Sequence, residues 1–426
     1  MLTIPFIREN KDKVLKGLAI KNFNHPELID QVLELDNERR ALQSKTNELQ
    51  ALMNTLSKEI GQLFKSGDRD KATQLKEQTT ALKQQLEGLE KEFQDASLHM
   101  NDLLVQIPNV PHPSVPAGKS EADNKEIRSG GTIPTLFDGA QPHWDLGKKY
   151  KLIDFDLGVK ITGGGFPVYL GMGARLQRAL ISYFLDQNTQ AGYEEILPPL
   201  MVNEASGFGT GQLPDKEGQM YHVTGDNLYL IPTAEVPVTN IYRDVILQSD
   251  DLPIKNTAYT PCFRREAGSY GKDVRGLNRV HQFDKVEIVQ IQHPSRSYEA
   301  LEEMVNHVEQ LVISLDLPYR ILQLCGGDLS FTSALTYDFE VYAAAQKKWL
   351  EVSSVSNFEA YQAHRLKLRF KEGGEKKTQL AHTLNGSALA LPRILAAILE
   401  NKQTPEGIQI PEVLLPYMGK GNEVIR

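Results

Sequence analysis

A seven-residue repeat of apolar side chains runs through the N-terminal quarter of the chain. From Glu27 onward one seam of the repeat is made of leucines, and a second seam accompanies it. The residues concerned are Leu35, Leu42, Leu49, Leu56 and Leu63, with Met53 and Ile60 on the second seam. Apolar residues at this spacing predict a coiled-coil helix.

A short polar break at Lys65-Ser66-Gly67-Asp68 interrupts the repeat. Beyond it the two seams resume as Leu75, Leu82, Leu89, Ala96 and Leu103, with Leu86, Phe93 and Met100. The glycine predicts a chain reversal, so we expect an antiparallel helical hairpin over about residues 27–105. About 37 residues at 1.5 Å each give an arm on the order of 55 Å long. Each helix can bury only one stripe, so this arm should project from a body. A coil that serves only as a spacer or a dimerisation element fits the pattern equally well.

Four prolines between Ile107 and Pro116 break any regular element, and polar, glycine-containing sequence follows to Gly131. We therefore expect an N-terminal domain over residues 1–106, a linker over 107–131 and a C-terminal domain over 132–426. In the last of these, short β-branched and aromatic runs, such as Asn227 to Ile231 and Lys285 to Ile291, predict strands. Helical periodicity returns in three segments, Ala174 to Leu185, Ser297 to Leu315 and Ser387 to Glu400. The expected class is α+β, with a mainly antiparallel sheet flanked by helices.

Charge and composition exclude few classes of protein function. The net charge is −8 and the isoelectric point about 5.8, so no overall basic field indicates nucleic-acid binding. No run of 18 apolar residues occurs, and the N-terminus lacks a secretory signal pattern; we expect a cytoplasmic protein that does not contact membranes. The two cysteines, Cys262 and Cys325, are too few for a zinc cluster and are expected to be buried thiols.

The chemistry is concentrated in one segment, because the chain has neither a P-loop nor a dinucleotide-binding fingerprint. A bound nucleotide would therefore need side chains to hold its phosphates. The segment from Thr260 to Glu287 reads as strand, basic loop and strand. An arginine on a strand, here Arg264, offers a rigid fork that can grip a phosphate, and Glu266, two residues on, projects from the same face.

The run Phe263-Arg264-Arg265-Glu266 resembles the second signature motif of the class II aminoacyl-tRNA synthetases, and its continuation through Phe283 and Glu287 resembles the seryl branch of bacterial type. Other segments resemble further parts of that family in the same order along the chain. They are Gly192 to Pro199 for the first motif, Leu230 to Glu235 for the serine loop, Glu351 to Asn357 for the ATP and metal segment, and His382 to Arg393 for the third motif. Ala388 and Pro392 depart from the family pattern, and Pro392 removes a backbone donor just before Arg393.

The resemblance implies a role for each matching residue. Arg264 and Arg393 would be catalytic, binding the α- and γ-phosphates of ATP, while Glu266 would accept from the adenine amino group and Phe283 would stack on the ring. The full ATP set would be Arg264, Arg265, Glu266, Val280, Phe283, Glu351, Val352, Ser353, Ser354 and Arg393. Serine would be held by Thr233, Ala234, Glu235, Glu287, Asn385 and Ser387. Glu351 and Ser354 would hold Mg²⁺.

The implied activity is a serine–tRNA ligase reaction in two steps: activation of L-serine with ATP, then transfer to tRNA(Ser), with tRNA(Sec) as a further acceptor. The family architecture implies a homodimer built on the first motif, with each tRNA bound across the two subunits by the arm. Two rivals remain. One is a class II relative that loads an amino acid onto a protein carrier, which the arm disfavours. The other is a coiled-coil scaffold on an inactive body, which has no need of Arg264, Glu266, Glu287, Glu351 and Arg393 together.

Overall fold

The computed structural model describes residues 1–215, 218–267 and 275–426. The chain divides into two compact units. One comprises Met1–Ala19 and Phe23–Pro108, and the other comprises Ile20–Asn22 and Asn109–Arg426.

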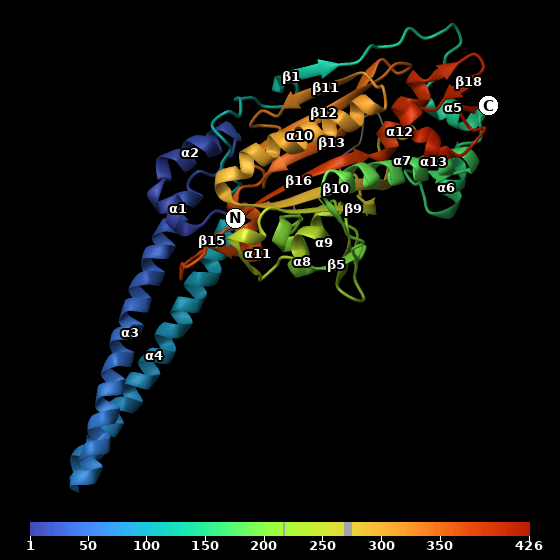
Figure 1. The fold of residues 1–426 in the computed structure, drawn as a ribbon. Helices are drawn as coiled ribbons and strands as arrows, with labels where there is room; N and C mark the ends of the chain where they lie inside the picture. Colours follow the sequence, from blue (N-terminus) through green and yellow to red (C-terminus); the bar gives the residue numbers. More distant parts are fainter. Residues whose placement is uncertain (216–217, 268–274) are drawn as a thin grey trace. The chain divides into compact units, whose positions relative to one another are not determined.

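The first unit is helical and contains the long hairpin (Figure 1). Its helices are α1 (Ile4–Glu9), α2 (Lys11–Ile20, whose last residue falls in the other unit), α3 (Leu28–Ser66) and α4 (Arg69–Leu104). The predicted seams bury Leu42, Leu86, Ala96 and Met100 between α3 and α4. Helix α3 ends at Ser66 and is followed by Gly67, whose φ of 85° is a left-handed conformation that glycine adopts without strain. The predicted arm and its reversal are confirmed.

The second unit is built on an eight-stranded sheet with the strand order β1-β11-β12-β13-β16-β10-β9-β4. Within the described residues its pairs are antiparallel, apart from the parallel pair β4 and β9. The strands are β1 (Lys125–Gly130), β4 (Glu194–Glu195), β9 (Ile254–Phe263), β10 (Gln282–Gln292), β11 (Tyr319–Gln323), β12 (Leu335–Ala343), β13 (Lys348–Asn357) and β16 (His382–Ala390). The predicted α+β class with an antiparallel sheet is confirmed.

Helices cover both faces of this sheet (Figure 1). The main core lies on one face, where α7 (Gly171–Gln190), α10 (Ser297–Ser314) and α12 (Leu391–Asn401) pack against apolar side chains such as Val286, Ile288 and Val355. On the other face Val238 of α9 (Glu235–Asn240), with Ala234 just before the helix, packs against Ala258 and Val289. Alternate residues of each strand therefore point into the core or toward this second face, called the open face below.

Short elements complete the second unit. Its other helices are α5 (His143–Lys149), α6 (Phe155–Ile161), α8 (Glu204–Thr210), α11 (Ala360–Leu366) and α13 (Leu415–Met418), with single 3₁₀ turns η1 (Glu121–Asp123), η2 (Ser249–Asp251), η3 (Pro294–Arg296) and η4 (Glu412–Leu414). Its other strands are β2 (Ile153–Asp154), β3 (Val168–Tyr169), β5 (Met201–Asn203), β6 (His222–Val223), β7 (Leu228–Leu230), β8 (Ile246–Gln248), β14 (Arg369–Lys371), β15 (Thr378–Leu380), β17 (Gln403–Thr404), β18 (Gly407–Gln409) and β19 (Val424–Ile425).

Two segments differ from the sequence-based expectation. Residues 107–131 were expected as a linker, but residues 109–131 belong to the second unit, where β1 pairs with β11 at the edge of the sheet. A helix was expected from Ser387, but β16 continues to Ala390 because it pairs with β10, Glu287 opposite Ser387 and Lys285 opposite Ala390. Helix α12 begins only at Leu391. Pro392 thus lies in its first turn, where a missing N–H costs no hydrogen bond.

Within the described part of the chain, none of the helices combines the length and the apolar character needed to cross a membrane.

Candidate active site

The strands β9 and β10 carry the predicted phosphate-binding arginine at their shared end. Phe263, the last residue of β9, pairs with Gln282, and Arg264 follows directly. The Arg264 guanidinium lies 5.3 Å from the centroid of the Phe283 ring, and its Nε donates to the carbonyl of Pro232 over 3.3 Å. Its backbone N–H donates to the carbonyl of His281, 2.9 Å away. The arginine that precedes the loop is thus held against the aromatic ring that follows it.

The neighbouring residues of the loop are also engaged. The Glu266 carboxylate accepts from the Arg279 guanidinium over 2.8 Å, so this ion pair joins the two sides of the loop. The Arg265 backbone N–H donates to the carbonyl of Gln219, 2.9 Å away, and Val280 is buried. The middle of this loop, residues 268–274, lies outside the described residues.

A buried charged cluster occupies the open face beside this loop. Lys285 forms an ion pair with Glu287, two residues along β10 and hence on the same face. The Lys285 ammonium also donates to the Thr233 hydroxyl over 2.9 Å, and that hydroxyl donates to the Glu287 carboxylate over 3.2 Å. All three residues are buried. The serine loop predicted around Thr233 is therefore tied to β10 by polar contacts.

A second carboxylate, Glu235, lies in the same cluster. Its side chain accepts from the Gln362 amide over 2.6 Å. Burial and then the nearby Glu287 carboxylate raise the pKa of Glu235 to about 7, although hydrogen bonds from Gln362 and Asn385 and the charge of Lys285 act in the opposite direction. Two carboxylates thus share one ammonium group here. A ligand carrying a second ammonium group would complete the balance of charge.

Strand β16 borders this cluster with the predicted third-motif residues. Ser387 pairs with Glu287, and Asn385 pairs with Val289 on one side and Ser356 on the other. The Ser387 carbonyl accepts from the Ser353 hydroxyl over 2.6 Å. Ala234 is buried against β9 and β10 and precedes the first turn of α9. The structure therefore brings together the six residues predicted to hold serine, Thr233, Ala234, Glu235, Glu287, Asn385 and Ser387.

The predicted metal segment lies on β13. The Ser354 hydroxyl donates to Asp338, which is directly opposite on β12, over 2.6 Å. Burial, and then the Glu351 carboxylate, raises the pKa of Asp338 well above its usual range. The Glu351 side chain is about half exposed, and Val352 points into the core. The oxygens of Glu351 and Ser354 thus belong to one strand beside a further, partly buried carboxylate.

This donor set fits magnesium. Among the described residues no three His, Cys, Asp or Glu side chains form a cluster that could hold a metal alone. Mg²⁺ typically takes one or two protein oxygens and completes its shell with phosphate oxygens and water. A partly exposed carboxylate next to a hydroxyl oxygen matches that requirement, whereas it would not satisfy a structural zinc site.

Arg393 approaches β13 from the start of α12. Its Nε donates to the backbone carbonyl of Asn278 over 3.0 Å, and its Nη1 donates to the backbone carbonyl of Glu351 over 2.8 Å. The Glu351 carboxylate lies 3.9 Å from the same Nη1 atom. Arg393 thus connects the return side of the loop after β9 with the predicted metal segment.

Three residues of the site were missed by sequence reasoning: Lys285, Gln362 and Asp338. Lys285 had a signal, because it lies two residues before Glu287 in a strand and must share its face. Gln362 and Asp338 lie outside the recognised segments and are brought in by α11 and β12. For them the sequence offers no local signal.

Comparisons with known proteins agree with this geometry. Residues 221–402 match the tRNA synthetase class II core domain (G, H, P, S and T). Residues 1–111 match the seryl-tRNA synthetase N-terminal domain. The sheet, the open-face site and these two matches define a class II aminoacyl-tRNA synthetase.

Relatives over the whole chain narrow the assignment. A serine–tRNA ligase from Salinibacter ruber is 50% identical over 420 residues, 98% of each chain. One from Geobacter sulfurreducens is 46% identical over 98% of this chain and 99% of its own. The crystal structure of seryl-tRNA synthetase from Pyrococcus horikoshii complexed with ATP has a TM-score of 0.93 and 34% identity, covering 100% of both chains. The chain belongs to the seryl-tRNA synthetase family.

The raised pKa of Glu235 predicts how stability depends on pH. Because the folded carboxyl keeps its proton up to about pH 7 and the unfolded one ionises near 4.5, the wild-type protein should lose stability as pH rises between these values. Glu235→Gln removes this pH-dependent loss. Above pH 7 its free energy of unfolding should exceed that of the wild type by up to about 3 kcal/mol. Both tryptophans, Trp144 and Trp349, lie in the second unit, so denaturation followed by tryptophan fluorescence measures the effect there.

The matched control for this measurement is Glu406→Gln, an exposed glutamate in the turn between β17 and β18. It should reproduce the pH dependence of the wild type. If Glu235→Gln also follows the wild-type curve between pH 5 and pH 8, Glu235 does not carry the raised pKa.

Proposed function

We propose that the open face of the second unit activates L-serine with ATP and that the chain then transfers the seryl group to tRNA(Ser). The observation that carries this proposal is that Arg264, bonded to the Pro232 carbonyl, adjoins the buried carboxylates Glu235 and Glu287, while Arg393 contacts Glu351 on β13. The membership in the seryl-tRNA synthetase family supports it. The reaction makes this chain a ligase that converts ATP to AMP and pyrophosphate.

For the ATP half of the site, Arg264 binds the α-phosphate and Arg393 the γ-phosphate, which makes both catalytic residues. Phe283 stacks on the adenine ring, Glu266 accepts from the adenine amino group, and Arg265 and Val280 line the pocket. The stacking of Arg264 on Phe283 and the pairing of Glu266 with Arg279 in the free protein support this division. Nucleotide binding would exchange part of these contacts for contacts with ATP. The strand residues Glu351, Ser353 and Ser354 line the opposite side of the ATP pocket, together with the backbone of Val352, whose side chain points into the core.

For the serine half, Glu287 and Glu235 supply negative charge to the substrate ammonium group. Thr233, Ala234, Asn385 and Ser387 surround the amino acid, and their polar groups hydrogen-bond its ammonium and hydroxyl groups. Because a site built around a hydroxyl leaves buried polar groups unpaired when the hydroxyl is absent, it can reject alanine by about 10⁴ or more. The charge balance of the cluster supports this assignment, since its one ammonium, Lys285, faces two carboxylates.

Glu351 and Ser354 are the residues that hold Mg²⁺. When bound, this ion neutralises phosphate charge. Asp338 accepts a hydrogen bond from the Ser354 hydroxyl. The lone pairs of the Ser354 oxygen therefore stay available to a cation.

Activation needs no nucleophile from the protein. A carboxylate oxygen of serine attacks the α-phosphorus of ATP, and the bond to the bridging oxygen breaks as pyrophosphate leaves. Catalysis then consists of positioning the two reactants and stabilising the charge that develops on the phosphates. Arg264 and Arg393, which present fixed forks from a strand end and a helix start, suit this task.

In the second step a terminal hydroxyl of tRNA attacks the seryl-adenylate. We assign tRNA binding to residues 1–106, through shape and phosphate contacts along the α3–α4 hairpin. The proposal includes a cytoplasmic homodimer, joined around Gly192 to Pro199, that binds each tRNA across both subunits. Leu197, with 86% of its surface exposed in the single chain, supports an interface there. We extend the proposal to tRNA(Sec) as a second acceptor.

Removal of the Arg264 guanidinium should abolish most of the activation reaction. We expect Arg264→Ala to lower serine-dependent exchange between ATP and pyrophosphate by at least about 10², equivalent to about 3 kcal/mol of charge-assisted contact. Arg264→Lys should recover only part of the activity, because a point charge does not reproduce the fork. The control, Arg296→Ala, removes an exposed arginine from η3 and should leave exchange unchanged. Normal exchange in Arg264→Ala would remove this residue from the site.

Shortening the arm should separate the two steps. The Arg39 guanidinium lies 5.7 Å from the Phe93 ring centroid, so a short Gly/Ser turn can join the helices there in place of residues 40–92. Exchange should stay within about twofold, because the site lies in the second unit, while transfer to tRNA should fall by about 10² or more as phosphate contacts are lost. The shortened protein should remain a dimer by sedimentation. Undiminished charging would show that the arm does not recognise tRNA, and a monomer would make the arm the oligomerisation element.

A further inference from the structure

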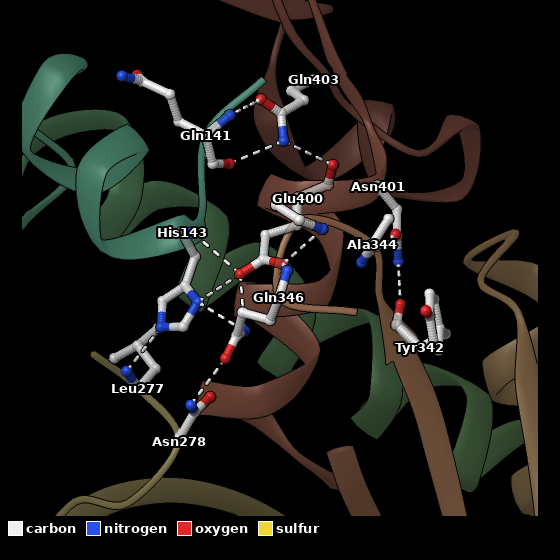
Figure 2. Close-up of polar contacts among 11 residues, drawn as sticks. Gln141, His143, Leu277, Asn278, Tyr342, Ala344, Gln346, Glu400, Asn401 and Gln403 are labelled. Atoms are coloured by element: carbon white, nitrogen blue, oxygen red, sulfur yellow. Dashed lines mark hydrogen bonds and ion pairs between the residues drawn. The ribbon is translucent and has the colours of Figure 1, made fainter. Parts of the chain in front are cut away.

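Glu400 is a fully buried carboxylate outside the proposed substrate site, and it is saturated with hydrogen bonds (Figure 2). Its Oε1 atom accepts from the backbone N–H and the ring Nδ1 of His143, at 3.0 and 2.8 Å, and from the side-chain amide of Gln346 at 2.7 Å. Its Oε2 atom accepts from the backbone N–H groups of Ala345 and Gln346, each at 3.1 Å. A buried carboxylate with this many donors is a rigid anchor, because any movement leaves charge uncompensated.

His143 extends this anchor to the return side of the loop that follows β9. The backbone N–H of Leu277 donates to His143 Nε2 over 2.8 Å. Since Nε2 accepts, the ring proton is on Nδ1, where it is donated to Glu400. Gly276 allows this approach: its φ is 66°, and a Cβ atom there would lie 2.2 Å from His143 Nε2.

Gln346 makes the second connection. It lies in the turn between β12 and β13, and its side chain bridges two partners that are far apart in the sequence. Its amide nitrogen donates to Glu400, and its amide oxygen accepts from the Asn278 amide over 2.8 Å. Figure 2 shows Gln346 between these two residues.

Asn278 carries the chain of contacts to Arg393. Its backbone carbonyl accepts from Arg393 Nε over 3.0 Å. Arg393 and Glu400 are both on α12, seven residues apart, which is close to two turns and places them on one side of the helix. Helix α12 therefore carries Arg393 in its first turn and Glu400 about 10 Å further along. Through Gln346, Glu400 holds Asn278 against Arg393.

We propose that Gln346, held by Glu400, is a positioning residue for Arg393 in ATP binding. The inference rests on the proposed role of Arg393 as a ligand of the γ-phosphate. In the sequence of contacts Glu400, Gln346, Asn278 and Arg393, the buried carboxylate fixes the glutamine amide, the amide fixes the position of Asn278, and its carbonyl orients the guanidinium. Arg393 is thereby held toward the phosphates before ATP arrives, which reduces the entropy that binding must offset.

The experiment measures the dissociation constants of ATP with Mg²⁺ and of serine by equilibrium titration, so that variants without turnover can be compared. Gln346→Leu keeps the size of the side chain and removes both hydrogen bonds. We expect it to weaken ATP binding about 10-fold, the effect of losing one or two such bonds, and to leave serine binding unchanged. Asn278→Ala, which removes the same link from the other side, should weaken ATP binding to the same extent, and it provides the test if Gln346→Leu does not fold.

Gln403→Leu is the matched control. This buried glutamine donates to the carbonyls of Gln141 and Glu400, each at 2.9 Å, and does not belong to the connection from Gln346 to Arg393. It should lower the melting temperature but keep the ATP dissociation constant within about twofold. If Gln403→Leu weakens ATP binding as much as Gln346→Leu, or if Gln346→Leu leaves it within twofold of the wild type, the proposal is wrong.

Arg393→Ala separates this proposal from the proposed function. With Arg393 removed, adding Gln346→Leu should have almost no further effect on ATP binding, because two residues that act through one contact are not additive. A further 10-fold loss in the double variant would overturn the positioning role while the role of Arg393 stands. An unchanged ATP dissociation constant in Arg393→Ala alone would instead overturn the assignment of Arg393 itself.

Discussion

In the middle of strand β10, apolar Val286 and Ile288 lie on one face and charged Lys285 and Glu287 on the other, and the second unit is organised around this alternation. Val286 and Ile288 bind the strand to the helical core. Lys285 precedes Val286, and Glu287 lies between Val286 and Ile288, so the side chains of Lys285 and Glu287 point to the open face. Both are buried there. Since the register with β9 and β16 fixes the strand on both sides, these charges can neither move apart nor reach water. A site that needs preorganised charge obtains it from the core packing on the reverse of the sheet.

The cluster around β10 has a charge pattern that a ligand can complete. Lys285 balances one carboxylate, and the remaining one, Glu235, holds its proton up to a pKa of about 7. An amino-acid ammonium group is the kind of charge this arrangement lacks. Arg264 follows the end of β9, and Arg393 lies in the first turn of α12, where it donates to the Glu351 carbonyl of β13. The separation of negative charge for an amino acid from positive charge for phosphates is what activation of an amino acid with ATP requires.

The sequence predicted those parts of the fold that have a local or periodic signal. The heptad residues such as Leu42 and Leu86 and the glycine at position 67 predicted the hairpin. Long-range pairing was harder: β1 lies in a segment whose prolines indicated a linker, and it is a strand only because β11 offers an edge. Likewise, the helical periodicity after Ser387 was outweighed by the pairing of β16 with β10, which delays the helix to Leu391.

For the site, the recognised segments located the residues expected to contact substrates, but not the residues that hold them. Gln362 reaches Glu235 across 127 positions in the sequence, and Glu400 reaches His143 across 257. Neither spacing has a periodicity or motif that sequence reasoning could detect. Such residues are defined by the packing of helices and strands that are distant in the chain, and they become visible only in three dimensions.

We infer that the charged cluster on the open face selects serine for activation by ATP. Exchange between ATP and pyrophosphate, measured with each of the twenty amino acids in turn, tests it most directly. We expect exchange with serine, with alanine lower by about 10⁴ or more in kcat/KM because it leaves the polar groups around the hydroxyl unpaired. Exchange with none of the amino acids, or equal exchange with alanine and serine, would contradict it.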